Sequence, residues 1–235
     1  MTYKEFRKIN PLKSMYNYSF IGYICLHITP LLSIFCINHK WTPNRMTLCM
    51  VITGIISGFV LMMPFLACKF LAFCGYFLWF TWDCADGEVA RFTKTFSKYG
   101  QELDWVSHLS CHSLFYIAIW MSLLQKGQYN MTLLSLFSLV FLSLELIGRN
   151  LIAFDRYLFS NERFGEHSSR SVVFRYLYSQ VLYFPNFVVF FPLVLFLDGY
   201  WGLGLIIYVY YIWAGLLSLY GLKEFVRYVI FFYKH

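Results

Sequence analysis

The sequence predicts an all-α integral membrane protein with six transmembrane helices preceded by an interfacial N-terminal helix, and with both termini in the cytoplasm. Composition indicates the membrane class, because 59% of the residues are hydrophobic and 13% are charged, whereas soluble domains carry roughly 25% charged residues. Apolar runs near or above the ~18 residues that span a bilayer recur along the chain. The uneven distribution of basic residues between these runs predicts the orientation.

Six apolar runs are the expected spans, and short connections rich in turn formers separate several of them. Two such connections are Gln125–Asn130 and Asp198–Gly202. The second run leads into acidic residues, so its helix is expected to continue past the hydrocarbon into the cytoplasmic interface. The predicted spans are Met46–Ala67, Phe70–Cys84, Leu103–Leu124, Met131–Leu151, Val172–Leu197 and Leu203–Leu222.

A seventh apolar run, Tyr16–Ile37, precedes these six. If it crossed the membrane, the basic N-terminus would lie outside, contrary to the positive-inside rule. Pro30 interrupts the run, and Asn17 and His27 give it polar positions. We therefore expect it to lie along the interface, or at most to re-enter the membrane.

With this topology, the predicted outer loops hold only Lys69 and Lys126 of the 19 Lys and Arg residues. The basic inner surface suits anionic lipid headgroups and phosphorylated substrates. Nucleic acid is not an expected partner, because the basic residues are spread over loops between spans. We expect one membrane domain over residues 1–235, made of an interfacial arm, 1–40, and a six-helix core, 41–225.

The stretch from Asp83 to His108 is expected to carry the chemistry, because acidic side chains in or near a bilayer are costly and are usually functional. Asp83 and Asp86 are three residues apart and share one helical face. Asp104 and His108 are four apart at the start of the next span, so they share a face too. An antiparallel helix pair joined by residues 91–100 would bring both faces together at the cytoplasmic end.

Carboxylates of this kind suit Mg²⁺ or Mn²⁺, which commonly bind through a few carboxylates and substrate phosphates. A bound ion would neutralise a pyrophosphate and stabilise charge on the leaving phosphate. Gly87 permits close approach of a ligand, and Arg91, Lys94 and Lys98 supply positive charge on the same side. A lone carboxylate at a helix end is usually only solvated, but the full spacing favours a site.

The chain reads Asp83-x2-Asp86-Gly87-x2-Ala90-Arg91-x8-Gly100-x3-Asp104-x3-His108. This pattern resembles the signature of the CDP-alcohol phosphotransferase (CDP-alcohol phosphatidyltransferase) family, D-x2-D-G-x2-A-R-x8-G-x3-D-x3-D, at every position except the last. Thr42-Pro43-Asn44-x-x-Thr47 also resembles the segment that opens the family's first transmembrane helix. The resemblance implies transfer of a substituted phosphate from a CDP-linked donor to an alcohol acceptor, with release of CMP, in phospholipid biosynthesis.

The resemblance also implies the roles of individual residues. Asp83, Asp86 and Asp104 would bind the metal ions that hold the donor pyrophosphate. The residues expected around the cytidine nucleotide are Gly87, Ala90, Gly100, Arg91 and Asn44. The active site would face the cytoplasm, and the family further suggests a homodimer.

His108 replaces the fourth aspartate of the signature, which is the family's proposed general base. An unperturbed imidazole has a pKa near ~6.5, so it can accept a proton from a hydroxyl at physiological pH. It can also ligate a transition metal, and it gives the site one negative charge fewer than four aspartates would. We predict that His108 is the base or a modified ligand of a second metal. The alternative is an inactive member that binds nucleotide or lipid.

Residues for the acceptor are expected between the fourth and fifth spans. Arg149 and Arg170 flank span ends, where they could bind an anionic group of a phosphorylated polyol. Glu145, four residues before Arg149, is expected to pair with it. His112, four residues after His108, is expected to be a hydrogen-bonded helix contact.

The donor remains open between two types. We favour CDP-diacylglycerol with a water-soluble alcohol, because the chain is short and the predicted cytoplasmic cavity is basic. The alternative is a CDP-linked small alcohol with a lipid or lipid-linked glycan acceptor. A transporter would place its carboxylates near the bilayer midplane and would show repeated or broken helices, whereas these carboxylates lie at span ends.

Overall fold

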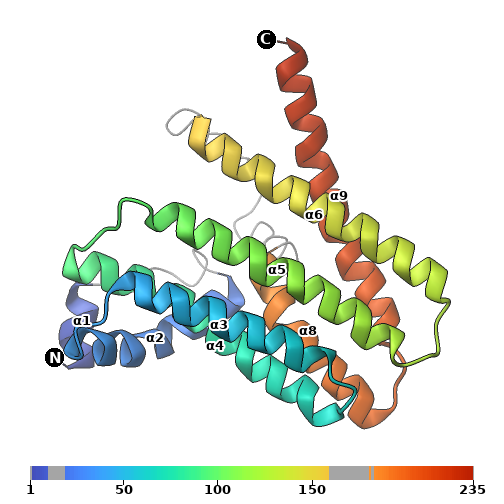
Figure 1. The fold of residues 1–235 in the computed structure, drawn as a ribbon, viewed down its shortest axis with the longest axis horizontal. Helices are drawn as coiled ribbons and strands as arrows, with labels where there is room; N and C mark the ends of the chain where they lie inside the picture. The colour runs from blue at the N-terminus through green and yellow to red at the C-terminus, as the bar shows by residue number, and fades with distance from the viewer. Residues whose placement is uncertain (1, 10–18, 159–179, 181–182, 235) are drawn as a thin grey trace.

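The computed structural model describes residues 2–9, 19–158, 180 and 183–234. The described chain forms helices joined by short loops, which confirms the predicted all-α class. An N-terminal arm consists of α1 (Tyr3–Ile9) and α2 (Phe20–Asn38). The helices that follow are α3 (Pro43–Met62), α4 (Leu66–Thr93), α5 (Gly100–Leu124), α6 (Met131–Leu158), α8 (Phe184–Trp201) and α9 (Ile206–Lys234), as Figure 1 shows.

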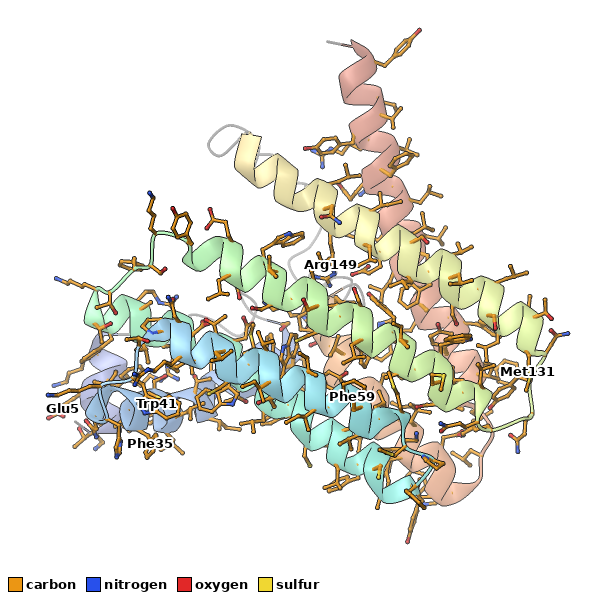
Figure 2. The ribbon with its side chains drawn as sticks, viewed as in Figure 1. Glu5, Phe35, Trp41, Phe59, Met131 and Arg149 are labelled. Carbon is orange, nitrogen blue, oxygen red and sulfur yellow. The ribbon has the colours of Figure 1, made fainter. Side chains whose placement is uncertain are left out.

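Six of the described helices are long and apolar enough to cross a membrane, which agrees with the predicted number. The set is α2, α3, α5, α6, α8 and α9. By composition α2 qualifies although we expect it at the interface, whereas α4, which contains the predicted span Phe70–Cys84, is not in the set. Large apolar side chains such as Phe59 and Met131 are exposed on the outside of the bundle (Figure 2). The protein is a multi-pass integral membrane protein.

The turn between α3 and α4 lies earlier than predicted. Pro64 disfavours the helical conformation at the residue before it, and Met63 is accordingly extended, with φ −64° and ψ 142°. The first predicted span, Met46–Ala67, therefore includes the turn and the start of α4. Residues 172–179 of the fifth predicted span lie outside the described residues, and α8 begins at Phe184.

Lys69 was expected in an outer loop, and that prediction is wrong. Lys69 lies in the first turns of α4 and is 7% exposed. Its ammonium donates to the carbonyl oxygens of Leu61 and Met63, at 2.6 and 2.7 Å, and to Ser122 Oγ at 3.0 Å. The last carbonyls of a helix have no partner within the helix, so Lys69 caps the end of α3.

Asp198 was likewise predicted in a loop but lies in α8, where its side chain is buried. Its Oδ1 accepts from the backbone N–H groups of Leu205 and Ile206, at 2.7 and 3.1 Å, at the beginning of α9. Its other oxygen pairs with Lys126 from the loop after α5. The carboxylate thus joins the α5–α6 and α8–α9 connections.

The N-terminal arm packs beside the second half of α4. Cys25 Sγ lies 3.7 Å from Thr81 Oγ1, and Ser33 Oγ donates to Glu88 Oε2 at 2.9 Å. Phe6 of α1 stacks on Phe92, with ring centroids 5.7 Å apart. The arm therefore contacts the end of α4 that carries the acidic residues, and Figure 1 shows α1 and α2 together at one end of α3 and α4.

Candidate active site

Helix α3 supports the two helices that carry the acidic signature. A Cβ atom at Gly54 would lie 2.5 Å from Cys111 Sγ of α5 and 2.9 Å from Trp79 Cδ1 of α4. Because glycine permits this close approach, α4 and α5 both pack tightly on α3 and less extensively on each other. Side chains of α4 and α5 therefore meet in the space beside α3.

Three predicted site residues meet there. His108 Nε2 lies 3.1 Å from Asp83 Oδ1 and 3.4 Å from Asp104 Oδ1. One ligand atom from each residue can be chosen so that all lie within 4.8 Å of one another. We call Asp83, Asp104 and His108 the trio. The structure thus brings the two predicted faces together across α4 and α5.

Asp86 belongs to a different contact. Its Oδ2 accepts a hydrogen bond of 2.8 Å from Thr47 Oγ1 of α3, and Thr47 is 5% exposed. Asp83 contacts α5, so the two carboxylates make their contacts with different neighbouring helices. Asp83 and Asp86 share the predicted face of α4 but contact different helices. Thr47 fixes the orientation of Asp86.

The residues expected around the nucleotide lie at the exposed end of the site. The Arg91 guanidinium folds back over Gly87, where an added Cβ would lie 3.1 Å from one of its nitrogens. Ala90 is half-buried, and Gly100 is the first residue of α5. Asn44 is exposed and its side-chain amide reaches Ser97 Oγ in the α4–α5 loop at 3.5 Å. The structure groups these residues near the loop but does not bring them into one contact.

Aromatic rings surround His108. Trp79 lies edge-on to it, with centroids 5.5 Å apart and an interplanar angle of 88°, and the His112 centroid lies 5.3 Å away. His112 also packs on Phe184, at 4.3 Å. His112 is buried, and neither of its ring nitrogens has a hydrogen-bond partner in the part of the chain that the structure describes. The expected hydrogen bond of His112 is thus replaced by ring packing.

Arg149 pairs with Glu145 as predicted, with Arg149 Nε 2.5 Å from Glu145 Oε1. Its guanidinium carbon lies 4.1 Å from the centre of the Phe184 ring, and Figure 2 shows the side chain on the side of α6 that faces α5. Phe184 in turn contacts His112, which packs against His108, so two rings separate Arg149 from the histidine of the trio. Arg170 lies outside the described residues.

Glu88 is a buried acid of the signature helix that the pattern of site residues did not single out. It is 1% exposed, and its Oε1 accepts from an Arg7 guanidinium nitrogen of α1 at 3.1 Å. Its spacing from Asp86 places it on another face of α4. An acid in an apolar segment together with an arginine in the N-terminal arm is the signal that could have predicted the pair.

A divalent cation fits the trio. Two carboxylates and an imidazole supply ligand atoms close together. Asp104 Oδ1 is buried yet accepts no hydrogen bond from any described residue, and buried oxygens rarely lack a partner. This donor set could hold a metal ion.

The profile of the CDP-alcohol phosphatidyltransferase family matches residues 40–213 of the 235 residues. The sequence matches no curated protein. The matched region contains the whole signature and the helices that carry it. The chain therefore belongs to the CDP-alcohol phosphatidyltransferase family, whose members are metal-dependent enzymes that transfer a substituted phosphate from a CDP-alcohol donor.

Proposed function

We propose that the protein transfers a phosphatidyl group from CDP-diacylglycerol to a water-soluble alcohol and releases CMP. The observation that carries this proposal is the convergence of Asp83, Asp104 and His108 within 4.8 Å, at the position of the family signature. A cation in this site would balance the negative charge of the donor pyrophosphate. The site would face the cytoplasm, where CDP-linked donors and soluble alcohols meet.

The reaction exchanges one phosphorus–oxygen bond for another. The acceptor oxygen forms a bond to the phosphorus that carries the diacylglycerol, and the bond from that phosphorus to the oxygen of CMP breaks. CMP leaves as an anion, and the hydroxyl proton passes to a base on the protein. Positioning and charge stabilisation therefore supply most of the catalysis.

Asp83, Asp86, Asp104 and His108 are the proposed metal ligands. When bound, the ion polarises the phosphate oxygens and stabilises the charge that develops on CMP. Thr47 holds Asp86 in place, and residues of the α4–α5 loop supply positive charge for the nucleotide. Lys94 and Lys98 are exposed in this loop, and Arg91 is exposed in the last turn of α4.

His108 and Asp104 are the proposed proton acceptors. His108 Nε2 faces the carboxylates, at 3.1 Å from Asp83 Oδ1, and Nδ1 is buried without a hydrogen-bond partner among the described residues. A ligand role and a base role therefore compete for the same atom. If either role holds, His108→Ala should lower kcat at least about 100-fold, and full turnover of this variant would exclude both.

Apolar residues beside the site support a lipid-linked substrate. Leu103 and Val106 flank Asp104 on α5 and are 39% and 56% exposed. They offer an apolar surface for acyl chains next to the metal ligands. The basic α4–α5 loop suits the nucleotide, and the apolar surface beside it suits acyl chains. CDP-diacylglycerol carries both groups, so we favour it as the donor.

The acceptor would bind toward Arg149 and Arg170. Arg149 is 20% exposed at its side chain and remains paired with Glu145, so an anionic acceptor would have to share the guanidinium. Arg149→Lys keeps the positive charge but loses the planar guanidinium, which can donate two parallel hydrogen bonds to one anionic group. We expect it to raise the KM for a phosphorylated polyol while leaving donor binding unchanged.

The test is CMP release from purified protein in nanodiscs. CDP-diacylglycerol and CDP-linked small alcohols are offered as donors against a panel of soluble alcohols and lipids, with and without a divalent cation. We expect CMP from CDP-diacylglycerol only when a cation and a soluble alcohol are present. Turnover of the small CDP-alcohols alone would overturn the donor assignment, and no CMP from any donor would indicate an inactive member.

A further inference from the structure

We propose that the trio selects a first-row transition dication such as Mn²⁺ over Mg²⁺. The inference rests on the proposed metal-dependent function and concerns the identity of the ion. Its starting point is the position of His108, whose Nε2 lies 3.1 Å from Asp83 Oδ1 and 3.4 Å from Asp104 Oδ1. The imidazole nitrogen stands where the family signature supplies a carboxylate oxygen.

The aromatic surroundings hold the imidazole in this position. Trp79 lies one helical turn before Asp83, and His112 lies one turn after His108. Their rings pack against the His108 ring at centroid distances of 5.5 and 5.3 Å. Nδ1 is buried and has no hydrogen-bond partner among the described residues, so packing orients the ring and leaves Nε2 toward the carboxylates.

The change from oxygen to nitrogen alters which ions bind well. Mg²⁺ favours hard oxygen ligands in octahedral geometry and keeps several waters. Imidazole is a good ligand for transition dications, whose affinity for N and O sites rises from Mn²⁺ toward Cu²⁺. The replacement also removes one negative charge. This weakens the binding of a hard cation such as Mg²⁺, because that binding depends on charge attraction.

The proposed ligand role of His108 gives the two carboxylates of the trio, Asp83 and Asp104, different roles. If Nε2 of His108 holds the ion, that nitrogen cannot accept a proton, and Asp104 would accept the proton of the acceptor hydroxyl. The Asp104 side chain is 45% exposed, whereas those of His108 and Asp83 are 19% and 21% exposed. Asp104 therefore has an oxygen that a soluble acceptor can reach.

The first test measures metal binding without substrate. Isothermal titration of the apoprotein with MnCl₂ and with MgCl₂ gives the ratio of the two Kd values for the wild type and for His108→Asp. We expect the preference for Mn²⁺ over Mg²⁺ to fall about tenfold in His108→Asp. An unchanged ratio in a folded variant would overturn the proposal, even if CMP release is normal.

The second test detects the nitrogen directly and needs no variant of the trio. Protein loaded with one equivalent of Mn²⁺ is studied by pulsed electron paramagnetic resonance for coupling to ¹⁴N of a bound imidazole. The wild type and His112→Phe should both show the coupling, because His112 packs against His108 and does not belong to the trio. Absence of ¹⁴N coupling in the wild type, or its loss in His112→Phe, would show that His108 is not the ligand.

Discussion

Thr47 restrains the carboxylate that lies outside the trio. Its hydroxyl donates to Asp86 Oδ2 from the buried first turns of α3. A neutral hydroxyl leaves the negative charge of Asp86 available to a cation while it fixes the orientation of the carboxylate. Residues that orient metal ligands in this way commonly change activity when they are replaced.

Thr47→Val should lower kcat/KM for CMP release about 10-fold, because the carboxylate of Asp86 loses its only hydrogen bond from α3 among the described residues. Thr53→Val is the matched control, since the one bond of the Thr53 hydroxyl within the described part of the chain is to the Cys49 carbonyl of its own helix. Equal activity of both variants would contradict the role of Thr47.

The sequence predicted the trio residues but not which carboxylates would meet. Spacing along α4 places Asp83 and Asp86 on one face. It does not show that Asp83 contacts α5 while Asp86 contacts α3. Glu88 shows the same limit, because its partner Arg7 is 81 residues away along the chain. Local periodicity identifies a polar position, whereas its partner depends on tertiary packing.

Helix α4 carries a different polar contact at each end. Lys69 near its beginning caps α3, and Glu88 near its end pairs with the N-terminal arm. Both groups are buried, so each would be costly without its partners. These contacts fix α4 against its neighbours on both sides of the site residues.

Lys69→Met should lower the free energy of unfolding by about 2 kcal/mol, because buried carbonyls at the end of α3 lose their donor. The measurement is thermal unfolding in detergent. Lys223→Met is the control, since 67% of that side chain is exposed. If both variants melt at the same temperature, the cap contributes no stability.

Glu88→Met should destabilise the protein by about 3 kcal/mol, because it leaves the Arg7 guanidinium without its carboxylate in a buried site. The double variant Arg7→Met/Glu88→Met should melt at a higher temperature than Glu88→Met, since the guanidinium that lost the Glu88 carboxylate is removed as well. A double variant that is less stable than the single would argue against the ion pair as the cause.

Element boundaries show why α3 and α4 were only partly predicted. The apolar run continues through Met63, Pro64 and Phe65, so hydropathy alone does not mark the turn. By contrast, the predicted Gln125–Asn130 connection separates α5 from α6 as expected, because it contains polar turn formers. Turn chemistry determines a boundary that hydropathy leaves open.

At the scale of the whole molecule, the arm and the α4–α5 loop lie at the same end of α4. Phe6 stacks on Phe92, two residues before the loop begins at Lys94. The arm contacts the second half of α4 through Cys25 and Ser33. These contacts place the arm beside the part of α4 that carries the site residues. We predict that α2 lies at the interface, with the N-terminus on the same side of the membrane as the site.

Labelling of single cysteines tests this orientation. In a cysteine-free background, Glu5→Cys and Thr95→Cys should both resist a membrane-impermeant thiol reagent in intact cells, and Gln128→Cys should react. All these positions are exposed, so burial does not explain protection. If α2 crossed the membrane, Glu5→Cys would react while Thr95→Cys stayed protected.

The contact between Arg7 and Glu88 also constrains the order of assembly. During synthesis the arm leaves the ribosome before α4 does, because Glu88 lies 81 residues after Arg7, so the Arg7–Glu88 pair can form only once α4 has been made. Docking of the arm is therefore a late event that can proceed only after the α3–α4 hairpin is in place. A bulky fusion partner attached to the N-terminus would hinder that step, whereas one attached after α9 would leave it free.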